Sequence, residues 1–294
     1  LHVRTLGRLG TDTQAGGGSL QSNITGTLGL LTVSGDVKDV FFVVNGGANG
    51  KIGAITIGGS LIGGSATNSG EIRSNGDMGL VKIGGNVQGG LGENTGLINT
   101  AGNLAGVRIG GSLIGGSNTD SGEIFSTGNM GPVKIGGDVQ GGAGFQSGRI
   151  RSGGNLASVS IGGSLIGGSN SNTGEIVSTG DMGMVKIGGN VQGGSNSFSG
   201  SILSTSNLAG VSIGGSLIGG SNLNTGEIRS FGDMGVVRIN FDMKGGSGIL
   251  SGSIQSGGNL SSVGVGGSLI GGSNTSSGLI FSNGDTGAVR IGGN

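Results

Sequence analysis

The chain lacks several residue types on which common folds and sites depend. Its 294 residues include no Cys, Trp or Tyr and a single proline, Pro132. Without cysteine no disulfide framework or thiolate metal site can form, and one proline is too few for collagen or a proline-rich linker. The only histidine, His2, leaves a Ser-His-Asp triad or a histidine metal site without visible partners.

The chain also lacks an excess of either charge. Fifteen Lys and Arg residues balance fifteen Asp and Glu residues, so no overall basic field attracts nucleic acid or an anionic membrane. No apolar run reaches the ~18 residues of a membrane span. We therefore expect no nucleic-acid partner and no membrane span, and because no motif indicates a cofactor or a metal, we expect neither.

What the chain has in abundance is glycine, with 78 residues. Glycine costs about 0.5–1 kcal/mol relative to alanine inside a helix, so long helices are excluded. Glycine-rich chains without a period are usually flexible, but here Ile and Val recur regularly. The period of that recurrence indicates an ordered fold.

The sequence has a 26-residue period. The motif Ile-Gly-Gly begins at Ile57, Ile83, Ile109, Ile135, Ile161, Ile187, Ile213 and Ile291, and in altered form at Ile239 and Val265. A stronger match appears at twice that period, because Gly-Gly-Ser-Leu-Ile-Gly-Gly alternates with Gly-Gly-Asn/Asp-Val-Gln-Gly-Gly. The unit that duplicated is therefore interpreted as a pair of copies.

Each copy predicts three short strands separated by glycine pairs and polar turns. In one copy the first strand carries Met182, Val185 and Ile187, the second centres on Val191, and the third carries Ile202. Stacked at about 4.8 Å, such copies pair their strands and close a shared core. The sequence thus predicts an all-β fold, a right-handed parallel β-helix (β-solenoid) with 26-residue coils and three short strands per coil, about eleven coils and roughly 50 Å long.

Equivalent positions form columns along the predicted stack. An inward isoleucine column comprises Ile72, Ile98, Ile124, Ile150, Ile176, Ile202, Ile228, Ile254 and Ile280. A Ser/Thr column runs two residues later from Ser74, and an Asn/Asp column from Asp77 opens each coil. Outward positions are expected for two charged columns: Lys82, Lys134, Lys186, Arg238 and Arg290, and Glu71, Glu123, Glu175 and Glu227, with Arg149 between Glu123 and Glu175. The columns are interpreted as structural, and the charges as a solvated face or a contact between rods.

The period weakens at both ends. Residues 27–50 read as a 24-residue coil, and residues 1–26 match the repeat only at Gly18–Ser22. We expect an irregular N-terminal cap or pairing arm over 1–26 and the β-solenoid over 27–294. The C-terminal motif Ile291–Asn294 stops in the middle of a coil, and an uncapped solenoid end exposes unpaired backbone groups that invite another coil.

The repeats Ile-Gly-Gly-Ser-Leu-Ile-Gly-Gly and Gly-Asp-Met-Gly-x-Val-Lys-Ile-Gly-Gly resemble those of secreted bacterial parallel β-helix repeat proteins of the adhesin and cell-surface class. The resemblance covers about residues 27–294 and transfers no catalytic or binding motif. It implies an elongated structural or adhesive protein that is extracellular or at the cell surface.

These observations favour a structural role. We expect self-association into an extracellular filament or surface fibre by end-to-end stacking, in which the N-terminal segment supplies the missing part of the next subunit's C-terminal coil. The candidate assembly interface comprises Leu1, Val3, Leu6, Leu20, Val289, Ile291 and Asn294. A stalk segment of a larger adhesin is the first alternative. The second is a β-helix protein that binds or cleaves polysaccharide, although no carboxylate cluster indicates an enzyme.

Overall fold

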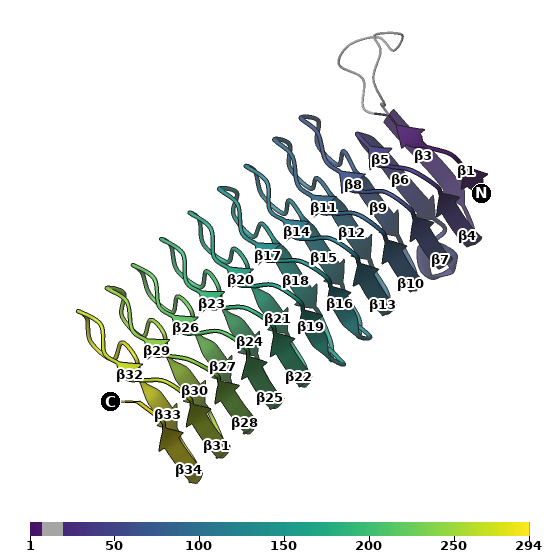
Figure 1. Ribbon diagram of the computed structural model, residues 1–294. Helices are drawn as coiled ribbons and strands as arrows, with labels where there is room; N and C mark the ends of the chain where they lie inside the picture. The colour runs from purple at the N-terminus through teal and green to yellow at the C-terminus, as the bar shows by residue number, and fades with distance from the viewer. Residues whose placement is uncertain (8–19, 294) are drawn as a thin grey trace.

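The computed structural model describes residues 1–7 and 20–293, and these residues form an all-β parallel β-solenoid of about eleven turns (Figure 1). Three parallel sheets run along the rod, and strands β1 and β34 lie at its opposite ends (Figure 1). The predicted fold class, with its 26-residue coils and three strands in each coil, is confirmed. None of the described helices is long and apolar enough to span a bilayer, and the one that is assigned, η1 (Gly47–Asn49), is a short 3-10 turn.

Each coil places one strand in each sheet. Sheet A contains β1 (His2–Val3), β4 (Leu28–Val33), β7 (Ile52–Ile57), β10 (Met78–Ile83), β13 (Leu104–Ile109), β16 (Val133–Ile135), β19 (Val159–Ile161), β22 (Met182–Ile187), β25 (Leu208–Ile213), β28 (Met234–Ile239), β31 (Leu260–Val265) and β34 (Thr286–Ile291). Sheet B contains β2 (Leu6–Gly7), β5 (Val37–Lys38), β8 (Leu61–Ile62), β11 (Val87–Gln88), β14 (Leu113–Ile114), β17 (Val139–Gln140), β20 (Leu165–Ile166), β23 (Val191–Gln192), β26 (Leu217–Ile218), β29 (Met243–Lys244) and β32 (Leu269–Ile270). Sheet C contains β3 (Leu20–Thr25), β6 (Val40–Asn45), β9 (Glu71–Ser74), β12 (Leu97–Thr100), β15 (Glu123–Ser126), β18 (Arg149–Ser152), β21 (Ile176–Ser178), β24 (Ile202–Ser204), β27 (Ile228–Ser230), β30 (Ile254–Ser256) and β33 (Ile280–Ser282).

Strand register follows the sequence period. Ile83 pairs with Ile109 in sheet A and Ile98 with Ile124 in sheet C, so the partners in each pair are one period apart. The expected 24-residue coil is present, since Val33 pairs with Ile57. Each residue therefore stacks on its equivalents in the coils before and after it.

The core is a stack of aliphatic columns inside the three sheets. From Ile72 to Ile254 the predicted isoleucine column is completely buried. The residue after each sheet B core position, such as Ile62 or Ile166, is only half-buried, and Gln88 at the same position is exposed. These isoleucines thus lie at the margin of the core.

Strand pairing begins before residue 27, where we expected the regular stack to start. Strands β1, β2 and β3 pair in parallel with β4, β5 and β6, so described parts of the segment 1–26 already contribute to all three sheets. Between β1 and β2 this segment has Arg4 and Thr5 where later coils have Gly-Gly, but its alternating Leu20 and Ile24 still pack against the core. Strand pairing in this segment therefore follows from alternating apolar residues and not from the 26-residue repeat.

Polar ladders close the corners between sheets. The Ser74 hydroxyl donates to Gly50 O at 2.6 Å, and Ser204 donates to Gly180 O at 3.0 Å, so the buried Ser/Thr column satisfies backbone carbonyls of the preceding coil. A second ladder begins at Asp77, whose Oδ1 accepts from Asn103 N–H at 3.0 Å. A Cβ on Gly102 would lie 2.6 Å from that oxygen, which favours the glycine found before every ladder residue from Asp77 to Asp285 except Asn207. Asn207 follows Ser206, whose hydroxyl donates to Asp181 Oδ1 at 2.6 Å.

Candidate functional site

The N-terminal end layer holds four of the seven predicted assembly residues. Val3, Leu6 and Leu20 are half-buried and pack on the core, whereas Leu1 is 53% exposed. The Leu1 ammonium group donates to Leu30 O at 2.8 Å. Among the described residues, strands β1, β2 and β3 have a partner strand on one side only, so within this part of the chain their other edges present unpaired N–H and C=O groups.

The C-terminal end layer lies at the other end of the rod (Figure 1). Ile291 is half-buried and Val289 is 44% exposed, while Asn294 lies outside the described residues. Leu269 and Ile280 are also half-buried in this layer. Sequence reasoning left these two out of the interface, although Ile280 ends the isoleucine column that it had recognised.

The two end layers do not match one another strand for strand. Sheet A has 12 strands, whereas sheets B and C have 11 each. The first and last described strands, β1 and β34, both belong to sheet A. Strand β1 pairs with only Thr32 and Val33 of the six-residue β4.

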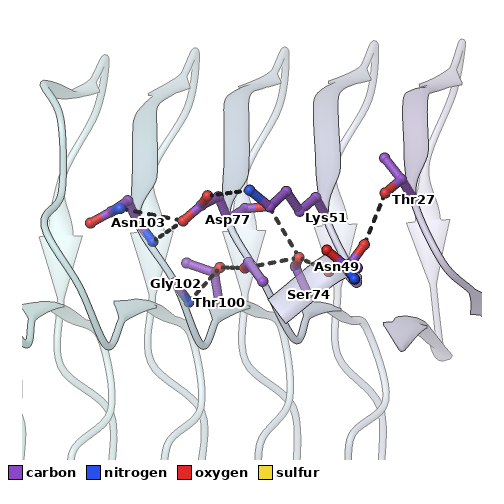
Figure 2. Close-up of polar contacts among 10 residues, drawn as sticks. Thr27, Asn49, Lys51, Ser74, Asp77, Thr100, Gly102 and Asn103 are labelled. Carbon is purple, nitrogen blue, oxygen red and sulfur yellow. Dashed lines mark hydrogen bonds and ion pairs between the residues drawn. The ribbon is translucent and has the colours of Figure 1, made fainter. Parts of the chain in front are cut away.

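The corner before sheet A carries the exposed Asn/Asp column. Figure 2 shows Asp77 there, accepting from Asn103 N–H and Nδ2, and forming an ion pair of 3.0 Å with Lys51 Nζ. The Asn103 backbone and then Lys51 hold the pKa of Asp77 below its usual range. Ladder bonds continue coil by coil to Asp285 N–H, which donates to Asn259 Oδ1 at 2.9 Å. The column is confirmed as corner chemistry.

The glutamate column is not solvated, and our expectation of an exposed outward position is wrong. Glu71, Glu123, Glu175 and Glu227 are each 3% exposed or less. They follow the strand alternation and point away from the core, but the loops that project between sheets B and C (63–70 and equivalents; Figure 1) immediately precede them and cover them. Burial raises the pKa of Glu71 to about 7, and those of Glu123 and Glu227 to about 8.

Arg149 occupies the same column, between Glu123 and Glu175 as predicted. Its side chain is buried, which the sequence did not predict. Its Nε lies 2.9 Å from Glu175 Oε2, so the two side chains form a buried ion pair. With the Gln146 amide oriented so that its nitrogen donates to Asp120 Oδ1, its oxygen accepts from Arg149 Nη1 at 2.7 Å. Burial still raises the pKa of Glu175, against the opposing effect of Arg149.

These groups do not form a recognisable reaction centre. Within residues 1–7 and 20–293, no three His, Cys, Asp or Glu side chains gather as metal ligands. The buried glutamates lie under the loops, and the open groove over sheet A's first corner, about 650 Å³, is lined by the Asn/Asp ladder and small residues such as Ala157 and Gly183.

Comparison with family models, with curated protein sequences and with solved structures finds no match for this chain.

Proposed function

We propose that this chain is a structural subunit of a filament that grows by head-to-tail stacking of solenoids. The unequal strand count carries the proposal. If β32 and β33 of one copy paired with β2 and β3 of the next, sheets B and C would continue without a gap, and sheet A would have one strand too many. Either β1 or β34 must then leave its place.

Strand β1 is the weaker of the two. It pairs with two residues of β4, whereas β34 pairs with five residues of β31. We infer that β34 of one copy replaces β1 on β4 of the next copy, which is a form of β-strand addition. If the columns of equivalent sheet A residues continue across the contact, Val289 lies against Leu31 of the next copy and Ile291 against its Val33. Two predicted assembly residues then enter core positions.

Sheets B and C would complete the contact. The same columns place Leu269 against Leu6 of the next copy and bring β33 alongside β3. Burying each aliphatic side chain contributes about 1.5–3 kcal/mol, and the unpaired edge groups of both layers gain partners. An extracellular or cell-surface location is part of this proposal and rests on the resemblance of the repeats.

Negative-stain electron microscopy across a range of protein concentrations tests the proposal. We expect unbranched fibres with an axial repeat of about 50 Å for the full chain. A variant without residues 286–294 should form only single rods, because it lacks β34. A variant without residues 1–5 should form fibres at lower concentration, because β4 is then already free.

Isolated rods at every concentration of the full chain would contradict the filament, and would favour a stalk segment whose further coils belong to the same polypeptide. Fibres that persist without residues 286–294 would contradict the strand exchange. Circular dichroism of both variants checks that the β-solenoid remains folded.

A further inference from the structure

The outer face of sheet A carries positive charge without negative charge. Its strands contain six basic residues at one outward position, and no Asp or Glu occurs in the described strands of this sheet. The six residues are Lys82, Arg108, Lys134, Lys186, Arg238 and Arg290. All six are exposed, and none makes an ion pair with another residue of the described chain. The neutral net charge conceals this segregation, because the acids lie at corners, in loops and under the loops.

Strand register fixes the spacing of these cations. Lys82, Arg108 and Lys134 stand on successive coils, about 4.8 Å apart. Towards the C-terminus the cations occur on every second coil, about 9.6 Å apart, with Ser160 and Ser212 between them. The sheet thus sets the spacing of the Cα atoms that carry this row of charges along the rod.

One interval in this row is hollow. Gly264 pairs with Arg238 on one side and with Arg290 on the other. A shallow, open depression of about 770 Å³ lies over these three residues and is also lined by Asn240, Val289 and Ile291. Asn240 replaces the glycine found at this corner in the neighbouring coils, at Gly214 and Gly266. Gly264 and Asn240 both depart from the repeat, and they lie next to the same depression.

Packing does not explain the glycine at this position. A Cβ on Gly264 would meet no atom within 4 Å, whereas on most other glycines of the chain it would overlap backbone or side-chain atoms. The missing side chain leaves room between two guanidinium groups, which bind carboxylates in paired hydrogen bonds.

We propose that sheet A binds a linear acidic polysaccharide laid along the rod, with one carboxylate seated over Gly264 between Arg238 and Arg290. The two-coil spacing of the cations is of the order of a disaccharide in an extended polysaccharide, so carboxylates that recur once per disaccharide can meet successive cations. The hollow accepts a carboxylate, and Asn240 offers an amide to a neighbouring hydroxyl. This face is present on a single rod, so the proposal does not depend on filament growth.

Nucleic acid fits this face less well. Duplex DNA carries one charge per about 1.7 Å of axis, far denser than this row. Proteins that bind single strands stack bases on aromatic side chains, and the described strands of sheet A contain no Phe, Trp or Tyr.

Binding to hyaluronan, which has one carboxylate per disaccharide, tests the proposal, with neutral dextran and duplex DNA as comparison probes. We expect hyaluronan binding that weakens as salt rises from ~50 to ~200 mM. Replacing both arginines (R238Q with R290Q) should weaken it about tenfold or more. The double variant R73Q with R229Q removes the same charge from sheet C and should bind as the parent does.

The variant Gly264→Thr tests whether hyaluronan binding can be lost while the stability of the fold is kept. The side chain enters open space in a strand, so thermal stability should be unchanged or higher, while the filled hollow should weaken hyaluronan binding several-fold. The proposal is overturned if R238Q with R290Q binds like the parent, if dextran binds equally well, or if DNA binds more tightly than hyaluronan.

Discussion

At the scale of single residues, the buried glutamates are the most unusual feature of the chain. A carboxylate loses its hydration under the loops, and Glu123 Oε1 has no hydrogen-bond partner among the described residues. The raised pKa values of Glu71, Glu123 and Glu227 follow from this burial, which favours the neutral acid. The folded chain therefore holds protons at neutral pH that the unfolded chain releases.

This difference predicts stability that falls as pH rises. An unfolded glutamate ionises near 4.5, while the folded ones ionise near 7 or 8. Between these values the folded state binds more protons, so the free energy of unfolding should decrease from about pH 4.5 to about pH 8. Urea unfolding at several pH values across this window measures the slope.

Glu227→Gln keeps the shape of the side chain and removes its titration, so the slope should become shallower. Glu93→Gln, in an exposed part of a loop, is the matched control and should leave the slope unchanged. If the parent and Glu227→Gln show the same slope, the buried glutamates are not the cause.

Adding one methyl group should have opposite effects on stability at two glycines, Gly154 and Gly264. On Gly154 a Cβ would overlap Asn129 Oδ1, which accepts from Asn155 N–H at 2.8 Å in the corner ladder. Gly154→Ala should therefore cost about 1–3 kcal/mol, since it disturbs a hydrogen bond and forces the corner apart. Gly264→Ala enters open space and should be neutral or stabilise by up to about 1 kcal/mol. Chemical denaturation midpoints of the two variants test this contrast, and equal losses would refute it.

At the scale of strands and coils, periodic sequence was sufficient to predict most of the fold. Stacking repeats each environment once per coil, so the burial of Ile72 and the corner role of Asp77 were visible as columns. The burial of Glu71 was not visible in the sequence, because strand alternation places its side chain outward and only the path of the preceding loop, residues 63–70, covers it. Val3 and Leu6 pair without the corner motif, and the unequal strand count depends on where pairing begins. The right-handed winding stays a prediction.

At the scale of the whole molecule, the rod is close to one-dimensional, since each coil contacts mainly the coils before and after it. In such repeat proteins, stability is roughly a sum of coil and neighbour-interface contributions. Removing one complete coil should therefore preserve the fold, provided that the newly joined neighbours are compatible. The glutamate column sets this condition. A coil with a buried glutamate always alternates with a coil that has another residue at that position, so two glutamates are never direct neighbours.

Two single-coil deletions test the condition. Deletion of residues 201–226 brings Glu175 next to Glu227, placing two buried carboxyl groups about 4.8 Å apart, whereas deletion of 227–252 brings Ser201 next to Ser253. Both proteins should fold, but the first should be less stable above about pH 7, because burying two like charges side by side is costly. Adding Glu227→Gln to the first deletion should restore stability to the level of the second. Thermal melting at pH 5 and pH 8 provides the comparison. If the two deletions melt alike at pH 8, alternation in the glutamate column does not govern which coils can be neighbours.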